Sequence, residues 1–203
     1  MTTNLFRHAA RGLAVLSCAV VLTGCLSMNS YVDPALPRVA KADIVAPAHP
    51  RPVQIAVEFR TKGSANAAAT AEVQPRVLAV ASESGLFSSV SSTAAGPDAG
   101  LLTVMIDNVP LEGENAAADG FGTGLTLGAV GSMVTDVYVT HITYTRGGET
   151  TSVDVRHALH TTIGNKAGPE GLTAVTPVEA VHQVIDQTIW NGLDQLADRR
   201  AFD

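Results

Sequence analysis

The chain has only two cysteines among its 203 residues, Cys18 and Cys25, and both lie near the start of the sequence. From residue 26 onward the sequence therefore offers no disulfide framework and no thiol nucleophile. Long apolar runs are also missing: the uncharged run Leu13–Leu22 is shorter than the roughly 20 residues of a membrane span. These absences exclude a disulfide-stabilised domain, a cysteine enzyme and an ordinary transmembrane helix at residues 13–22.

The residues around this apolar run indicate protein export. Arg7 and Arg11 precede it, in the order of the charged and apolar regions of a signal peptide. The run leads into the sequence LTGC, which ends at Cys25 and resembles the bacterial lipobox. That resemblance implies acylation of Cys25 and cleavage of the bond before it. We therefore predict a signal peptide at residues 1–24 and a lipid on Cys25. The competing interpretation is a core helix that ends in a cysteine.

Net charge narrows the partners that the exported chain could bind. Loss of two arginines with the signal peptide lowers the 13 basic residues to 11, against 19 acidic ones, so the formal charge becomes −8. An acidic surface disfavours nucleic acid and adhesion to anionic head groups, which leaves membrane residence to the acyl chains. Leu26 and Ser27 follow the cysteine, whereas resemblance to enterobacterial lipoproteins associates an aspartate there with inner-membrane retention. We expect an outer-membrane anchor and a domain that faces the periplasm.

The mature chain divides into a proline-rich start and a longer remainder. Prolines interrupt helices and strand ladders, and a cluster of them predicts a lipidated, extended tether over residues 25–52. The cluster consists of Pro34, Pro37, Pro47, Pro50 and Pro52. Residues 53–203 suffice for a single domain with its own core.

Alternation of apolar and polar residues predicts most of the strands. They are expected at residues 53–60, 86–92, 101–109, 136–144 and 150–162. The last two flank a glycine turn at residues 146–149, which predicts a hairpin. A helix is expected to end at Gly85. Pro75 either kinks this helix or lies in the first turn of a shorter helix that begins near Glu72.

The clearest helix signal lies near the end of the chain. Thr176, Pro177 and Glu179 have the positions of a capping box with proline at the first helical position. An apolar stripe follows, formed by Val178, Val181, Ile185, Ile189, Leu193 and Leu196. The order of elements predicts an α+β domain with a mainly antiparallel sheet and two helices packed on one face, after a disordered tether.

The run Ser84–Val90, SGLFSSV, joins the end of the predicted helix to a strand. This short sequence is similar to part of the small α+β periplasmic modules of envelope-assembly lipoproteins. Examples are lipoproteins of lipopolysaccharide transport, the curli secretion lipoprotein and the amino-terminal domain of the Tol-system propeller protein. The resemblance covers residues 52–109 and implies a role in the cell envelope, but it transfers no functional residue to this chain.

An uncharged segment at residues 120–135 contains Gly120, Gly124 and Gly128 at intervals of four. On a helix this spacing would give a close-packing face in lipid, although the segment is slightly short for a span. A membrane-inserted β-hairpin within an oligomer is the second interpretation. We favour the third, a glycine-rich loop that leads into a buried strand.

Candidate catalytic and metal-binding groups are few. His157 and His160 are three residues apart, but in a strand this spacing points them to opposite faces and disfavours a shared metal ion. The acidic residues between Glu112 and Asp119 lack the order of a calcium loop, and no G-x-S-x-G sequence occurs. We therefore expect neither a metal, a cofactor nor an enzyme.

Three functional hypotheses follow. The first is a lipid-anchored, non-catalytic envelope protein, a protein-binding or assembly module that presents its sheet edge or its final helix with Trp190. The alternative is an oligomeric membrane-inserting or secretion component that uses residues 116–139. A hydrolase or metal enzyme assembled from ordinary residues is the third hypothesis, and we favour the first.

Overall fold

A computed structural model describes residues 27–110 and 131–203 of the chain. One seven-stranded sheet has the order β1-β7-β6-β5-β2-β3, and β4 also pairs with β2. The strands are β1 (Met28–Val32), β2 (Arg51–Thr61), β3 (Ser64–Ala65), β4 (Phe87–Ser91), β5 (Gly100–Pro110), β6 (Ser132–Arg146) and β7 (Glu149–Ile163). The helices are α2 (Ala67–Ser84) and α5 (Pro177–Asp198), with a 3-10 turn η1 (Lys41–Asp43).

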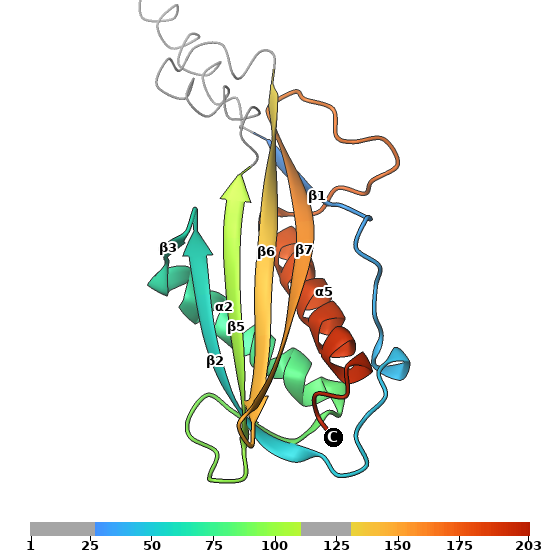
Figure 1. Ribbon diagram of the computed structural model, residues 1–203. Coiled ribbons are helices and arrows are strands. Elements are labelled where there is room, and N and C mark those ends of the chain that lie inside the picture. Colours follow the sequence, from blue (N-terminus) through green and yellow to red (C-terminus); the bar gives the residue numbers. More distant parts are fainter. Residues whose placement is uncertain (1–26, 111–130) are drawn as a thin grey trace, which may run out of the picture.

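Both helices lie behind the sheet, on the same face (Figure 1). Strand β2 runs parallel to β4 and β5, and the other strand pairs are antiparallel. The predicted α+β class, with a mainly antiparallel sheet and two helices on one face, is confirmed.

The hairpin of β6 and β7 is the longest paired region. Each strand has 15 residues, and the turn between them contains Gly147 and Gly148 with φ of 60° and 88°. Those positive values are why glycines occupy the turn. Tyr138, Ile142 and Val155 point toward the helices and are buried. The predicted hairpin is confirmed and extends further at both ends.

Helix α2 begins at Ala67, so Pro75 does not lie in its first turn. The side chain of Asn66 caps it by accepting a hydrogen bond from the Ala69 N–H at 3.0 Å. Pro75 lies inside the helix, which continues through it to Ser84. Gly85 then ends the helix in the left-handed conformation with φ of 79°, as predicted.

Helix α5 begins as its sequence predicts. The Thr176 hydroxyl accepts a hydrogen bond from the Glu179 N–H at 3.2 Å, and Pro177 occupies the first turn. Gly192 lets the helix approach the sheet closely, because a Cβ there would collide with Ile142. The apolar stripe is buried from Ile185 to Leu196, but Val178 is 63% exposed.

The largest difference from the sequence prediction concerns residues 27–52, which were expected to lie in the tether. Met28–Val32 forms β1, which pairs antiparallel with the end of β7. Residues 33–50, called the strap below, then run beside α5 toward β2 (Figure 1). The Asn191 side-chain amide donates to the Pro37 carbonyl at 2.8 Å, and Ile44 is buried. The described domain therefore begins well before residue 53.

Proline placement accounts for this difference. Met28–Val32 contains no proline, so every residue of β1 retains an N–H for the ladder. The prolines from Pro34 to Pro50 lie in the strap, where strand pairing is not required. Pro52 does lie in β2, at the point where the register between β2 and β4 shifts.

Candidate interaction surfaces

The sheet has one face that no described helix covers, because α2 and α5 both pack on the other (Figure 1). We call it the open face. Since strand side chains alternate between faces, its members follow from the register. They include Glu58 and Arg60 of β2, Leu101, Met105 and Val109 of β5, Val139, His141 and Thr143 of β6, and Ser152, Asp154 and Arg156 of β7.

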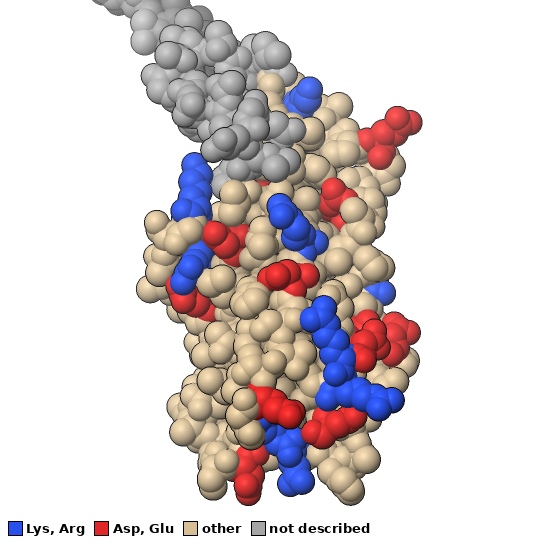
Figure 2. All heavy atoms as spheres, in the orientation of Figure 1, with Lys and Arg blue, Asp and Glu red and all other residues tan. Residues whose placement is uncertain are grey.

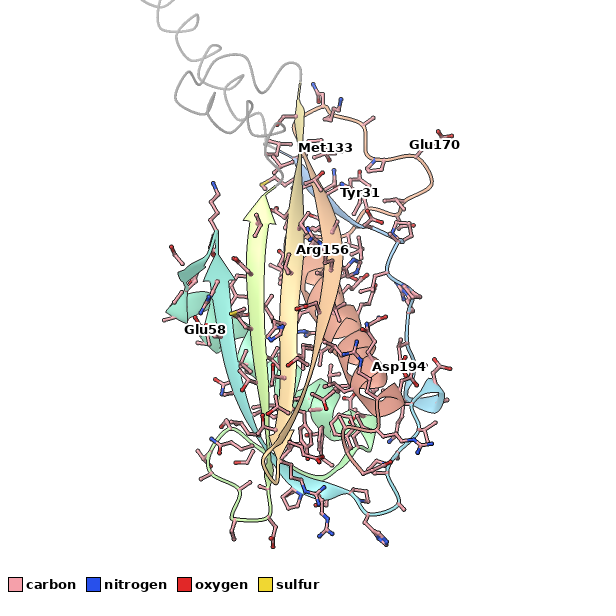
Figure 3. All side chains as sticks on the ribbon, in the orientation of Figure 1. Tyr31, Glu58, Met133, Arg156, Glu170 and Asp194 are labelled. Atoms are coloured by element: carbon pink, nitrogen blue, oxygen red, sulfur yellow. The ribbon has the colours of Figure 1, made fainter. Side chains whose placement is uncertain are left out.

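Charges of both signs are mixed across this side of the molecule (Figure 2). Glu58 and Arg60 form an ion pair with Nε and Oε1 2.8 Å apart. In Figure 3, Glu58 and Arg156 come from strands at opposite sides of the open face. Apolar side chains lie between the charges, and Leu101 and Val109, at the two ends of β5, are both 39% exposed. The face thus combines apolar contact area with the ion pair of Glu58 and Arg60.

A polar network occupies the centre of the open face. His141 Nδ1 lies 2.7 Å from Asp154 Oδ1, and His141 Nε2 lies 3.1 Å from the Thr143 hydroxyl. That hydroxyl is also 3.0 Å from the Ser152 hydroxyl. The sequence analysis missed this network, although the hairpin turn predicts it: counting five residues outward from Arg146 and Glu149 pairs His141 with Asp154.

The connectivity of Asp154, His141 and Thr143 is that of an acid, a base and a hydroxyl, as in hydrolase triads. Its setting differs, because the side chains of His141 and Asp154 are 43% and 71% exposed. Water reaches both groups, so the site lacks the desolvation that strengthens electrostatic catalysis.

A second candidate region is a cavity of about 480 Å³ between the strap and α5. It is lined by Val32, Asp33, Leu36, Arg38, Val175, Gln183 and Gln187, among others. Its walls mix aliphatic side chains with one acid, one base and two amides. Such a mixed lining defines no particular ligand.

His157 lies beside this cavity, only 4% exposed. Its Nδ1 accepts a hydrogen bond from the Ala158 N–H at 3.0 Å, so Nε2 carries the proton and donates to Gln187 Oε1 at 2.9 Å. Burial lowers the pKa of His157, against smaller raising effects of Gln187 and Asp33. This imidazole is a neutral structural group.

His160 makes different contacts. Its Nδ1 is 2.9 Å from the Thr135 hydroxyl, and its Nε2 is 3.4 Å from Asp33 Oδ2. The two histidines of β7 therefore have separate partners, as their strand spacing predicted. The described residues contain no group of three or more His, Cys, Asp or Glu side chains that could hold a metal ion.

Trp190 lies in a groove between α2 and α5 rather than on an open helix face. It is half-buried against the core, and the groove, about 370 Å³, is also lined by Pro75, Glu83 and the ion pair of Arg76 with Asp186. The Arg76 Nε donates to Asp186 Oδ1 at 3.0 Å.

The predicted lipidation site Cys25 and the glycines Gly120, Gly124 and Gly128 lie outside the described residues. Within the segment 116–139, the described part differs from the membrane-inserting interpretation. Residues 132–139 belong to β6 and are paired with β7 throughout, and with β5 from Asp136. Residues 136–139 are thus paired on both sides and form part of the domain's own sheet.

Among the residues that the structure describes, neither helix is both long and apolar enough to cross a membrane. Helix α5 is the longer of the two, with 22 residues, but it carries charged and amide side chains along its length.

The chain was compared with protein-family models, curated proteins and solved structures. No protein-family model matches the chain, and no curated protein sequence matches it. Similar solved structures include the following three. One is an uncharacterised protein, with 12% identity, a TM-score of 0.32, and coverage of 74% of this chain and 90% of that one.

The second is a dodecamer of a PelC variant from Paraburkholderia phytofirmans, with 10% identity, a TM-score of 0.36, and coverage of 83% of this chain and 98% of that one. The third is a DUF330 protein from Xanthomonas campestris, with 12% identity, a TM-score of 0.34, and coverage of 83% and 87%.

Proposed function

We propose that the chain is a non-catalytic lipoprotein of the cell envelope, anchored at the outer membrane through Cys25, which presents its open face to a protein partner. The observation that carries the proposal is the lipobox sequence LTGC ending at Cys25, three residues before β1 begins. A signal sequence followed directly by a sheet strand suits a lipidated domain.

The open face supports protein binding by its size and chemistry. Four strands spaced about 4.8 Å apart, each about 36 Å long, give a surface of roughly 700 Å². Stable protein interfaces bury about 800 Å² on each partner. Leu101, Met105 and Val139 supply apolar area, and His141 and Arg156 add hydrogen-bonding groups around it. The final helix is less available, because the strap and α2 flank it.

Lipidation is tested by metabolic labelling with palmitate in the native host. The wild-type chain should incorporate the label and fractionate with the outer membrane, whereas Cys25→Ala should lose the label and remain an unprocessed precursor. Cys18→Ala is the matched control and should keep the label, because Cys18 lies within the signal peptide. Label that persists in Cys25→Ala would overturn the anchoring proposal.

Partner binding is tested with a photo-crosslinking amino acid placed at single positions of the lipidated protein in intact cells. Thr143 reports on the open face, Glu83 on the groove beside Trp190, and Asp98 on an exposed loop that serves as the control. We expect a discrete protein adduct from Thr143 alone. An adduct from Glu83 alone would move the binding surface to the groove, and the proposal for the open face would be wrong.

A further inference from the structure

We infer that the domain stands upright on the membrane, with one end of its sheet against the lipid head groups. This inference rests on the proposed lipidation of Cys25. The surface in question, called the anchored end, consists of Met28, Lys62, Val109, Met133 and Lys166. Its partner is a phospholipid surface.

The distance between the lipid and the sheet is short. Ser27 is hydrogen-bonded to Gly164, the residue that follows β7. The Ser27 carbonyl accepts a hydrogen bond from the Gly164 N–H at 2.9 Å, and the Ser27 hydroxyl donates one to the Gly164 carbonyl at 3.0 Å. Two residue steps separate Ser27 from Cys25, a reach of about 7 Å in an extended chain. A lipid on Cys25 would therefore hold this end of the sheet at the membrane surface.

Several chain segments meet at the same end. Ile163 pairs with Met28 of β1 on one side and with Ser132 of β6 on the other. Gly131, with φ of 72°, lies so close to the backbone of Lys166 that a side chain would collide with it. Figure 3 places Met133 at this end, close to the start of β6. Strands β1 and β6 begin at this end and run away from it.

The backbone also places Lys62 and Val109 there. The Lys62 N–H donates to the Asn108 carbonyl at 2.9 Å, at the turn that follows β2. Because β2 and β5 are parallel, both strands finish at the anchored end, with Thr61 opposite Asn108. Two edges of the sheet thus contribute to one surface.

The side chains at this end suit an interfacial position. Met28 is 47% exposed and Val109 39% exposed, which makes them two of the few large apolar side chains that solvent reaches in the described chain. Lys62 and Lys166 can lay their aliphatic stems along an interface and keep their ammonium groups among the phosphates.

Acidic groups limit the electrostatic part of this contact. The Asp107 carboxylate accepts a hydrogen bond from the Gly63 N–H at 3.0 Å, and burial raises the pKa of Asp136. Among the described side chains at this end, Asp107 and Asp136 therefore offset the charges of Lys62 and Lys166. The acyl chains and the apolar side chains supply the attraction, and the lysines direct it.

The opposite end of the hairpin lies far from this surface. Each strand of the hairpin has 15 residues, so the turn at Gly147 lies roughly 45 Å away, at about 3.3 Å per residue. The open face then stands perpendicular to the membrane, where a soluble partner can approach it.

The orientation is tested by fluorescence quenching of the lipidated protein in vesicles of phosphatidylethanolamine and phosphatidylglycerol that carry a head-group nitroxide. Once Cys25 is acylated, an introduced cysteine is the only free thiol. A dye on Asn165→Cys should lose most of its fluorescence, and a dye on Glu149→Cys at the far end should lose little. Equal quenching at both positions would overturn the inference.

Two substitutions separate docking from anchoring. Val109→Asp should reduce quenching at position 165, whereas Leu101→Asp, equally exposed at the other end of β5, should leave it unchanged. Palmitate labelling should be equal in both variants. Equal quenching in the two variants would show that the apolar side chain does not dock, while loss of label in the wild type would instead refute the proposed lipidation.

Discussion

The two faces of the sheet differ sharply although they are built from the same strands. His141 of β6 is 43% exposed, whereas its neighbour Ile142 is fully buried under α5. One face is a close-packed core, and the other is a surface of charged side chains, hydroxyls and separate apolar side chains. We expect stability to depend on the covered face and partner binding on the open face.

The largest expected effect is at the far end of the covered face, where Phe202 is buried. Its ring centroid lies 4.9 Å from that of Tyr144 and 5.2 Å from that of Phe87, both edge-on. Phe202→Ala should lower the free energy of unfolding by about 3–5 kcal/mol, because it leaves a cavity among aromatic rings. Denaturant unfolding measures this change, and a loss below about 1 kcal/mol would show that the end of the chain is not packed there.

Neighbouring positions of β6 provide a direct comparison of the two faces. Ile142→Ala removes a fully buried side chain that packs against Gly192 of α5, and it should cost about 2–5 kcal/mol of unfolding free energy. Thr143→Ala changes the next residue on the open face and should cost about 1 kcal/mol or less. Similar losses in the two variants would contradict the distinction between the faces.

Protonation of His157, which lies on the covered face, should make the free energy of unfolding depend on pH. Its pKa in the folded protein is lowered by burial, so the unfolded chain binds the proton more tightly. Stability is therefore complete above the unfolded pKa of about 6.5 and falls as pH decreases from there toward the folded pKa.

Unfolding free energies measured from pH 8 to pH 5 test this dependence. His157→Gln should weaken the decline at acid pH, and His141→Gln, at an exposed position of the open face, is the matched comparison. The same decline in all three proteins would exclude His157 as its source.

The period-two pattern was enough to predict the hairpin and the fold class, because each strand buries every second residue. It failed for β1, where polar Ser30 is fully buried and the pairing partner Thr161 is distant in sequence. Pairing between residues that far apart is determined by the tertiary fold, so it leaves no pattern in the local sequence. Trp190 shows the same limit: its helix was predicted, but the α2 groove that half-buries it was not.

The smallest expected effect concerns the open-face network itself. His141→Ala removes an exposed imidazole and its contacts with Asp154 and Thr143, and exposed pairs of this kind contribute about 0–1 kcal/mol. The unfolding free energy should therefore stay within about 0.5 kcal/mol of the wild type, while the crosslinked adduct from Thr143 should weaken. A variant that unfolds readily would make the network part of the core, and unchanged crosslinking would show that the partner binds elsewhere. Because stability is expected to stay constant, loss of the adduct would be attributable to loss of the imidazole from the open face.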